Sequence, residues 1–423
     1  MLPSYAVRQA ALVGLAVNAV RPVGGYLGSV PAFAAGWLTS ELAPQLLAVA
    51  ATDTAAEVLW RRPRGRGSRL GLALGAAAAG GLGYLVYAAR KAPAQVEAAL
   101  VEGLGADYAD LLDSERPPDL VPTLSEIARP FRLHDPERVK VHRNVNYVEG
   151  GRRARLDIYV PRDVELSEAP VLIQVHGGGW TFGAKEEQGL ILMARMARAG
   201  WVCVAVNYRL APKYPWPSQI VDVKRAIAWV REHIAEYGGD PSYLTITGGS
   251  AGGHLAALAA LTPDLPDYQP GFEDADTSLA ACVPFYGVYD LGGITGDRHA
   301  VEMRDKFLGP VVFRKSPSTH LEDFVTASPL AHVRKDAPDF FVLHGVNDSL
   351  VSVRQARTFV AALRDKTDAT VTYAELPGTQ HAFEVFSSIR SQHVIRAVQR
   401  WLEWHRAGWL LEHRPAAPES TAG

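Results

Sequence analysis

Hydrophobic and polar positions divide this chain into two parts with different patterns. Up to about residue 92, apolar residues form long runs that contain few charges. From about residue 138, short β-branched runs alternate with longer stretches of helical spacing. Fully apolar strands that alternate with helices are typical of a mostly parallel sheet covered on both faces. The second part is therefore predicted to be an α/β domain.

The predicted strands of this domain are short runs rich in valine, isoleucine and aromatic residues. They are residues 155–161, 171–177, 201–208, 243–249, 281–288, 340–346 and 370–376. Helical spacing predicts helices at residues 218–237, 251–261, 354–365 and 391–406. In such a sheet, ligands bind at the carboxyl ends of the strands, so the residues that follow each strand are the candidates for chemistry.

The first part contains a candidate membrane helix. Residues 70–89 carry no charge over 20 residues, which is about the length that spans a bilayer core. Five arginines lie at positions 61–69, and Arg90 and Lys91 follow the run. An arginine-rich flank favours the cytoplasmic side, so the rest of the chain is expected outside the cytoplasm. The alternative is a buried apolar helix beneath the α/β domain.

Other segments set the expected domain boundaries. Residues 22–51 carry only one charge but are interrupted by Pro31 and Pro44, which indicates a second span or an interfacial segment. Residues 94–112 have helical spacing and would form a connector or a lid. We thus expect a membrane-associated helical region (1–92), a helical connector or lid (93–137), the α/β domain (138–412) and a disordered tail (413–423).

Composition narrows the function classes. The 423 residues carry a net charge of −2, which argues against a nucleic-acid partner. Residues 1–92 hold nine Lys/Arg and three Asp/Glu, so this part of the chain is basic. The remaining residues hold 34 Lys/Arg and 42 Asp/Glu, so the rest of the chain is acidic. The two cysteines, Cys203 and Cys282, lie in apolar strand-like runs. They are expected to be buried thiols, with no disulfide framework and no metal site.

The stretch "TITGGSAGGHLAAL" (245–258) places one serine between a strand and a helix, among glycines. A serine hydroxyl is a weak nucleophile until a base takes its proton, and it must project clear of the backbone. A sharp strand-to-helix turn, G-x-S-x-G, achieves this, with Gly248 and Gly252 giving clearance. Ser250 is therefore the predicted nucleophile.

The serine turn and one further loop are expected to provide backbone N–H groups for an oxyanion. Ala251 follows the serine at the start of a helix, and "HGGGW" (176–180) follows the predicted strand 171–177. Glycines let a backbone approach a ligand closely, so Gly178 and Gly179 are the favoured donors, with Gly177 next.

His381 and Asp348 complete the predicted triad. Each follows a strand, and the order Ser250, Asp348, His381 is the one expected for α/β-hydrolases. The aspartate would hold the imidazole tautomer and stabilise the imidazolium. Asp290 also ends a strand and is the alternative acid. Three other polar residues are interpreted as structural: Asp222, His254 and His344.

Together these motifs resemble the hormone-sensitive-lipase-like (bacterial family IV) branch of α/β-hydrolase carboxylesterases. The resemblance covers about residues 140–410 and rests on "HGGGW", "NYRLAPKYPWP", "GGDPSYLTITGGSAGGHLA", "HGVNDSLV" and "HAF". It implies ester hydrolysis without metal or cofactor, on short or medium acyl chains. The apolar front is similar to that of mycobacterial Lip-type esterases. Two departures stand out: Gly249 replaces the acidic residue that often precedes the serine, and no proline follows Asp348.

We therefore expect a membrane-associated serine esterase acting on small-molecule or lipid esters. The first alternative is an amidase, such as an arylformamidase, with the same triad. The second is an inactive hydrolase fold that only binds. Candidate pocket residues from their positions are Trp180, Phe182, Tyr208, Trp216 and Tyr286, and the insertion 291–339 is expected to shape the acyl pocket. The oligomeric state is left open.

Overall fold

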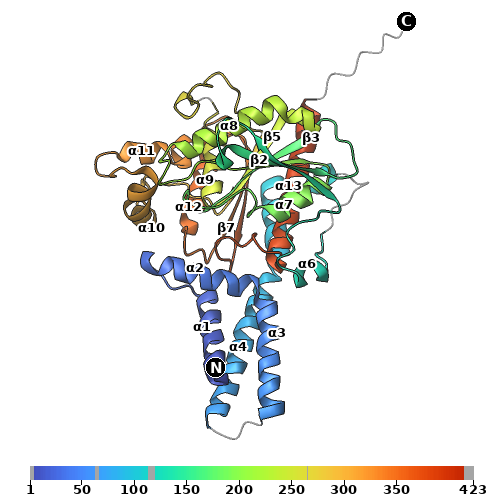
Figure 1. Ribbon diagram of the computed structural model, residues 1–423, viewed down its shortest axis with the longest axis vertical. Helices are drawn as coiled ribbons and strands as arrows, with labels where there is room; N and C mark the ends of the chain where they lie inside the picture. Colours follow the sequence, from blue (N-terminus) through green and yellow to red (C-terminus); the bar gives the residue numbers. More distant parts are fainter. Residues whose placement is uncertain (1–3, 62–65, 113–119, 264, 414–423) are drawn as a thin grey trace.

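The computed structural model describes residues 4–61, 66–112, 120–263 and 265–413. It consists of a head built around one sheet and a stalk of helices that extends from it (Figure 1). The head contains the residues that were predicted to form an α/β domain, and the stalk is built from the first 89 residues.

One eight-stranded sheet runs through the head in the order β1-β2-β4-β3-β5-β6-β7-β8. Strand β2 is antiparallel to both β1 and β4, and the neighbours from β4 through to β8 are parallel. The bounds are β1 (Val139–Asn146), β2 (Arg155–Pro161), β3 (Ala169–Val175), β4 (Val202–Val206), β5 (Gly239–Gly249), β6 (Ala281–Phe285), β7 (Asp339–Gly345) and β8 (Val371–Leu376). The predicted mostly parallel α/β fold is confirmed. Strand β1 was missed because its polar, half-exposed edge position leaves no apolar run.

Helices cover both faces of the sheet. One face packs against α5 (Ala92–Leu104), α7 (Leu190–Arg198) and α13 (Ile389–Glu412). The other packs against α8 (Ser218–His233), α9 (Ala251–Leu261) and α12 (Val353–Lys366). Both predicted cysteine positions are buried free thiols in β4 and β6, as expected.

Shorter helices fill the loops of the head. Between β6 and β7 lie α10 (Arg298–Met303), a π-helix (Arg304–Phe313), α11 (Leu321–Thr326) and a 3₁₀ turn (Pro329–His332). Elsewhere there are α6 (Leu124–Ala128) and 3₁₀ turns at Tyr108–Leu111, Arg152–Ala154, Ile234–Tyr237 and Pro266–Tyr268. Helix α6 lies at the end of the head nearest the stalk (Figure 1).

The stalk consists of α1 (Tyr5–Val20), α3 (Ala43–Ala56) and α4 (Arg66–Ala89), with a π-helical end to α3 at Glu57–Arg61. Helix α2 (Tyr26–Glu41) lies across the top of the stalk, against the head (Figure 1). The apolar segment 22–51 is therefore two helices divided at Leu42: the first lies crosswise, and the second is part of the stalk.

One helical stretch among the described residues, Gly67–Leu104, is long and apolar enough to cross a membrane. It joins α4 to α5 through a turn at Arg90 and Lys91. The α5 part belongs to the head, because Val96 and Leu100 are buried against the sheet and Glu97 pairs with Arg400 of α13. Helix α5 thus packs against the head, and the exposed apolar length lies in α4.

Candidate active site

The strand-to-helix turn at Ser250 has the strained geometry that the glycine pattern predicts. Strand β5 ends at Gly249, α9 begins at Ala251, and Ser250 between them has φ 59° and ψ −121°. A non-glycine residue in this region costs on the order of 1–3 kcal/mol. The Ser250 N–H donates to the Phe285 carbonyl at 3.0 Å, which ties the turn to β6.

Glycine is required beside the serine because the neighbouring backbone is too close for a side chain. A Cβ on Gly252 would lie 2.1 Å from the Val175 carbonyl oxygen, and one on Gly248 would lie 2.6 Å from Gly252. This close approach of α9 to β3 directs the positive end of the helix, including the Ala251 N–H, towards the serine.

The loop after β3 lies directly against this turn. A Cβ on Gly177 would lie 3.2 Å from the Ser250 Cβ. Gly178 and Gly179 have φ values of 111° and 55°, which side chains rarely allow. The Gly177 N–H donates to Gln188 Oε1 at 2.7 Å. That donor is engaged within the protein, which leaves the N–H groups of Gly178, Gly179 and Ala251 as the candidate donors to an oxyanion.

His176 supports the same loop from beneath. Its ring stacks on Tyr208 with 4.2 Å between centroids, and the Tyr208 hydroxyl donates to the His176 carbonyl at 2.8 Å. Burial lowers the pKa of His176 to about 4, so its ring is neutral at physiological pH. Both residues therefore shape the loop from within the core.

Asp348 and His381 are hydrogen-bonded to each other. His381 Nδ1 lies 2.6 Å from Asp348 Oδ2, while Asp348 Oδ1 accepts the backbone N–H groups of Leu350 at 2.9 Å and Val351 at 2.8 Å. One carboxylate oxygen of Asp348 is thus bound by the backbone of its own loop, and the other is bound by the His381 imidazole. His344 also lies close, with Nε2 3.3 Å from Asp348 Oδ2.

The surroundings keep the Asp348 carboxylate ionised. Burial alone would raise its pKa, but the charge of His381 and hydrogen bonds from His344 and His381 outweigh burial and hold this pKa well below its usual range. His344 was interpreted as a core residue, and it does lie buried, bonded to the Val351 carbonyl at 3.0 Å. Its contact with the acid was not foreseen.

Tyr286 contacts both the serine turn and the histidine. Its ring centroid is 4.4 Å from that of His381, and a Cβ on Gly249 would lie 2.6 Å from its hydroxyl. The hydroxyl donates to the buried Glu384 carboxyl. These contacts explain why position 249 is glycine, because Tyr286 fills the space that a side chain would need. The Glu384 carboxyl, bonded to the Tyr286 hydroxyl, brings an acidic group close to the position where an acidic residue often precedes the serine.

Two predicted pocket residues lie in the core instead. Trp180 is buried, and its indole N–H donates to His254 Nδ1 at 3.1 Å. Tyr208 is buried beneath His176. Their positions after strands suggested a pocket wall, but large aromatic rings there fill the space under the oxyanion loop. Of the other candidates, Trp216 is buried and stacks on Phe313, while Phe182 is exposed beside Gly178.

The insertion between β6 and β7 contributes a side chain that the sequence did not single out. Gly179 faces the ring of Phe307, since a Cβ on that glycine would lie 3.3 Å from the ring. Phe307 belongs to the π-helix of the insertion 291–339. An aromatic ring therefore lies beside the glycine loop that follows β3.

The alternative acid and the structural aspartate are engaged elsewhere. The Asp290 carboxylate accepts the backbone N–H groups of Ile294 and Thr295, each at 3.0 Å, and so closes a turn. Asp222 pairs with Arg209 at 2.7 Å. His254 is buried and neutral: burial lowers its pKa to about 4, and its Nε2 lies 2.8 Å from the Ala327 carbonyl.

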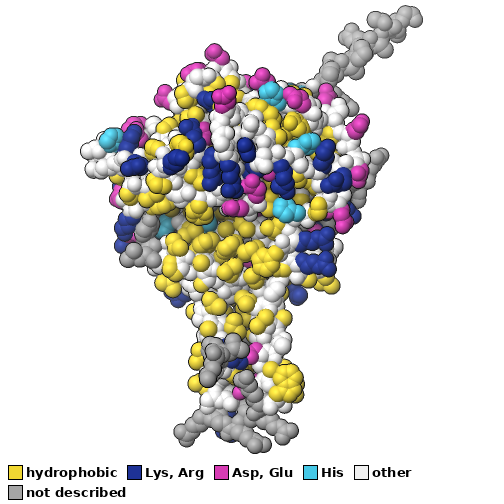
Figure 2. All heavy atoms as spheres, in the orientation of Figure 1, with side chains coloured by type: hydrophobic (Ala, Val, Ile, Leu, Met, Phe, Trp, Pro, Cys, Tyr) yellow, Lys and Arg dark blue, Asp and Glu magenta, His cyan; other side chains and the backbone are white. Residues whose placement is uncertain are grey.

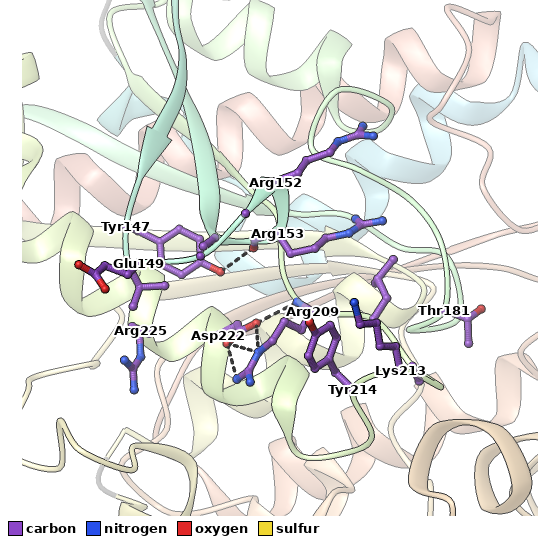
Figure 3. Close-up of a pocket in the computed structure, with 16 residues that line it drawn as sticks. Tyr147, Glu149, Arg152, Arg153, Thr181, Arg209, Lys213, Tyr214, Asp222 and Arg225 are labelled. Atoms are coloured by element: carbon purple, nitrogen blue, oxygen red, sulfur yellow. Dashed lines mark hydrogen bonds and ion pairs between the residues drawn. The ribbon is translucent and has the colours of Figure 1, made fainter.

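The Arg209–Asp222 pair lines a cavity of 720 Å³ beside the loop that contains Thr181 (Figure 3). Arg209 lies between Asp222 and the ring of Tyr214, and Tyr147 bonds to nearby backbone through its hydroxyl. The triad residues do not line this cavity. Within the described part of the chain, no group of three or more His, Cys, Asp or Glu side chains is arranged to hold a metal ion.

Helix α2 adds residues that the sequence analysis did not connect with the site. The Phe33 ring contacts the His381 ring at 5.7 Å between centroids, and the Trp37 indole N–H donates to the Ala382 carbonyl at 2.8 Å. Gln380 Oε1 accepts the backbone N–H groups of His381 and Ser349 and so links the loops of the base and the acid. The aromatic residues in this otherwise alanine-rich and glycine-rich segment were the only sequence feature that could have indicated a role of α2 at the site.

Comparisons with known proteins agree with this geometry. Residues 156–363 match the family model BD-FAE. The chain is 47% identical to the probable carboxylic ester hydrolase LipM of Mycobacterium tuberculosis over 324 residues, covering 76% of this chain and 75% of LipM. It is 46% identical to the esterase LipQ of the same organism, covering 75% of each. The butyrate-bound esterase Est2 of Thermogutta terrifontis has the same fold, with a TM-score of 0.53 at 24% identity over 66% of this chain and 96% of that one.

Proposed function

The chain belongs to the α/β-hydrolase family that includes the mycobacterial esterases LipM and LipQ and is a carboxylic ester hydrolase, and we propose that Ser250, His381 and Asp348 carry out its chemistry. The observation that supports these roles is the hydrogen bond of 2.6 Å between Asp348 and His381, together with the Tyr286 side chain, which contacts both the His381 ring and the strained serine turn.

In the proposed mechanism, the Ser250 hydroxyl attacks the ester carbonyl while His381 Nε2 takes its proton. Asp348 keeps the Nδ1–H tautomer in place and stabilises the imidazolium that forms. The alcohol leaves with the proton from His381, and an acyl group remains on Ser250. Water then attacks this acyl-enzyme, with His381 again acting first as base and then as acid, and the carboxylic acid is released.

The charged tetrahedral intermediates would be stabilised by backbone N–H groups of Gly178, Gly179 and Ala251. Each well-placed donor of this kind contributes about 3–4 kcal/mol to the transition state. The ring of Phe307 beside Gly179 restricts the room for the acyl group, which favours short and medium chains. We include this chain-length preference in the proposal.

The experiment is labelling with a fluorophosphonate probe, followed by turnover of p-nitrophenyl esters. We expect wild-type protein to be labelled and active on acetyl to octanoyl esters, and Ser250→Ala to lose both properties. Faster cleavage of the matching p-nitroanilides would indicate an amidase. Folded wild-type protein that takes no label would indicate a binding protein.

We further propose that α1, α3 and α4 are embedded in a membrane. Large apolar side chains project from the outer surface of the stalk: Val7, Val17, Val49, Leu59, Trp60, Leu70, Tyr84 and Tyr87. Two of its charges, both partly buried, pair with each other, because Arg8 Nη2 lies 2.6 Å from Asp53 Oδ1. Five arginines at positions 61–69 lie in sequence around the connection between α3 and α4, and an arginine-rich flank of this kind favours a head outside the cytoplasm.

This topology is testable because both native thiols are buried. A Val164→Cys variant on the head should react with an impermeant maleimide in intact cells. A Gly67→Cys variant, where nothing lies within 4 Å of the new Cβ, should react only after permeabilisation. The reverse pattern would invert the orientation, and release of the protein by alkaline carbonate would contradict membrane embedding.

A further inference from the structure

Helix α2 is held firmly between the stalk and the catalytic loops. At its C-terminal end, the buried Glu41 carboxylate pairs with Arg390 and accepts from the Ser388 hydroxyl at 2.6 Å. Near its N-terminal end, the Ser349 hydroxyl, next to Asp348, donates to the Ser29 carbonyl at 3.1 Å. With the Trp37 bond to Ala382 between them, these contacts make α2 a fixed wall beside His381.

A row of aromatic rings runs along this wall. It begins with Phe33 at His381 and continues to Trp37, whose ring stacks on Phe33 at 5.4 Å between centroids. Trp37 stacks in turn on Phe386 at 4.7 Å, and Phe386 meets the edge of Phe131 at 5.3 Å. We call these four side chains the aromatic row. It forms a continuous apolar surface from the histidine to the outside of the head.

The outer end of the aromatic row lies where the head meets the stalk. The Phe131 side chain is 66% exposed, and it follows α6, whose first residue, Leu124, is also exposed. Gln45 of α3 donates to the Ile127 carbonyl at 3.0 Å, so α6 is tied to the top of the stalk. Exposed Arg129 and Arg132 flank Phe131, as suits the phosphate level of a bilayer.

The surface of the head around its junction with the stalk is also apolar, and basic residues lie next to it. Figure 2 shows hydrophobic side chains gathered on the part of the head nearest the stalk, below a belt of Lys and Arg. They are continuous with the apolar surface of the stalk. A head whose stalk is embedded would therefore rest with this apolar face, and with the outer end of the aromatic row, on the bilayer surface.

From this continuity we propose that the substrate is a membrane-resident lipid ester, whose hydrocarbon chain passes from the bilayer along the aromatic row to the catalytic residues. The inference rests on the proposed esterase function and on the embedded stalk. A lipid chain loses hydrophobic stabilisation for every methylene that enters water. A continuous apolar path lets the ester reach Ser250 while the rest of the lipid stays in the membrane, and hydrolysis releases an acid and an alcohol.

The test uses the full chain reconstituted in vesicles of dialkyl-ether phosphatidylcholine, a lipid without ester bonds. Turnover of didecanoylglycerol, a membrane lipid ester with medium-length acyl chains, embedded in these vesicles is compared with turnover of water-soluble p-nitrophenyl butyrate. In Phe131→Ser we expect the ratio of lipid-ester to soluble-ester turnover to fall at least tenfold, and Phe131→Leu should restore most of it.

The matched control is Val164→Ser. Val164 is 61% exposed but lies between β2 and β3, at the amino ends of the parallel strands, whereas the proposed triad follows their carboxyl ends. The turnover ratio of Val164→Ser should stay within twofold of wild type. An unchanged ratio in Phe131→Ser, with Ser250-dependent butyrate turnover intact, would overturn the lipid route alone. No turnover of either ester would instead overturn the proposed function. A dimer that dissociates in Phe131→Ser would assign this surface to a second copy and would also overturn the lipid route.

Discussion

The ring of Phe33 meets the imidazole of His381 at 85°, with 5.7 Å between ring centroids. The two residues are separated by almost the whole length of the chain, and one belongs to the N-terminal helices while the other follows the last strand. This contact makes the N-terminal region part of the environment of the proposed base. Changes on either side of it should therefore be measurable in catalysis or in stability.

The acid assignment can be tested by replacing Asp348 with asparagine. The carboxylate holds the His381 tautomer through a bond of 2.6 Å, and an amide nitrogen placed there would favour the wrong tautomer. We expect kcat on p-nitrophenyl butyrate to fall by on the order of 10⁴. Asp290→Asn is the control, because Asp290 only closes a turn, and its kcat should stay close to wild type. A large loss at Asp290 and a small one at Asp348 would reverse the assignment.

The crowding behind the serine turn predicts a strong effect for Gly252→Ala. Its Cβ would lie 2.1 Å from the Val175 carbonyl oxygen, so α9 and β3 would have to separate. Such overpacking costs about 1–3 kcal/mol of unfolding free energy, and turnover should fall as the turn shifts. Gly408→Ala in α13, with nothing within 4 Å, should be neutral or stabilising by about 0.5–1 kcal/mol. Urea unfolding in detergent measures both, and equal effects would contradict the steric argument.

The buried pair between Glu41 and Arg390 should matter far more than a surface pair. Glu41→Ala leaves the Arg390 guanidinium buried without its partner, and this type of change costs about 3–5 kcal/mol. Asp368→Ala removes the partner of Lys335 at a highly exposed site, where we expect less than about 1 kcal/mol. The difference should appear in thermal unfolding of the two variants, and similar midpoints would show that α2 is not anchored by this pair.

Glu384 predicts a specific pH dependence of stability. Burial raises the pKa of the Glu384 carboxyl in the folded protein above 4.5, its usual value in the unfolded chain. At a pH between 4.5 and this raised pKa, the folded protein therefore holds a proton that the unfolded chain has released. The free energy of unfolding of wild type should therefore fall as the pH rises through that window. Glutamine cannot ionise, so Glu384→Gln should gain stability relative to wild type from about pH 4.5 upward, by at most about 1.4 kcal/mol per pH unit. A difference that is constant with pH would contradict this.

The sequence was sufficient for the parts of the site that depend on local backbone geometry. The serine turn, the glycine loop after β3 and the order of the acid and the base all follow from which residues can occupy positions directly after a strand. The mostly parallel sheet follows from short apolar runs between helices. These features are visible in sequence because each is set by a few adjacent residues.

The remaining features depend on contacts between distant segments. Gln188 engages the Gly177 N–H, and Trp180 turns inward to bond His254, although both residues lie near the glycine loop in sequence. The crosswise position of α2 follows from its bonds to Arg390, Ser349 and Ala382, more than 300 residues away. The pattern of apolar residues in the sequence indicated that α2 is apolar. This pattern could not identify the surface of the head that α2 covers.

The crosswise helix has a practical consequence for anyone who wishes to handle this enzyme in water. Removing the first 92 residues would remove Phe33, Trp37 and Glu41 together with the apolar stalk. The shortened protein would keep Ser250, Asp348 and His381 but would lose the Phe33 ring that contacts His381 and the Trp37 indole that donates to the Ala382 carbonyl. Rate constants and inhibitor affinities measured on such a shortened enzyme would describe a histidine that lacks the aromatic neighbours it has in the intact chain.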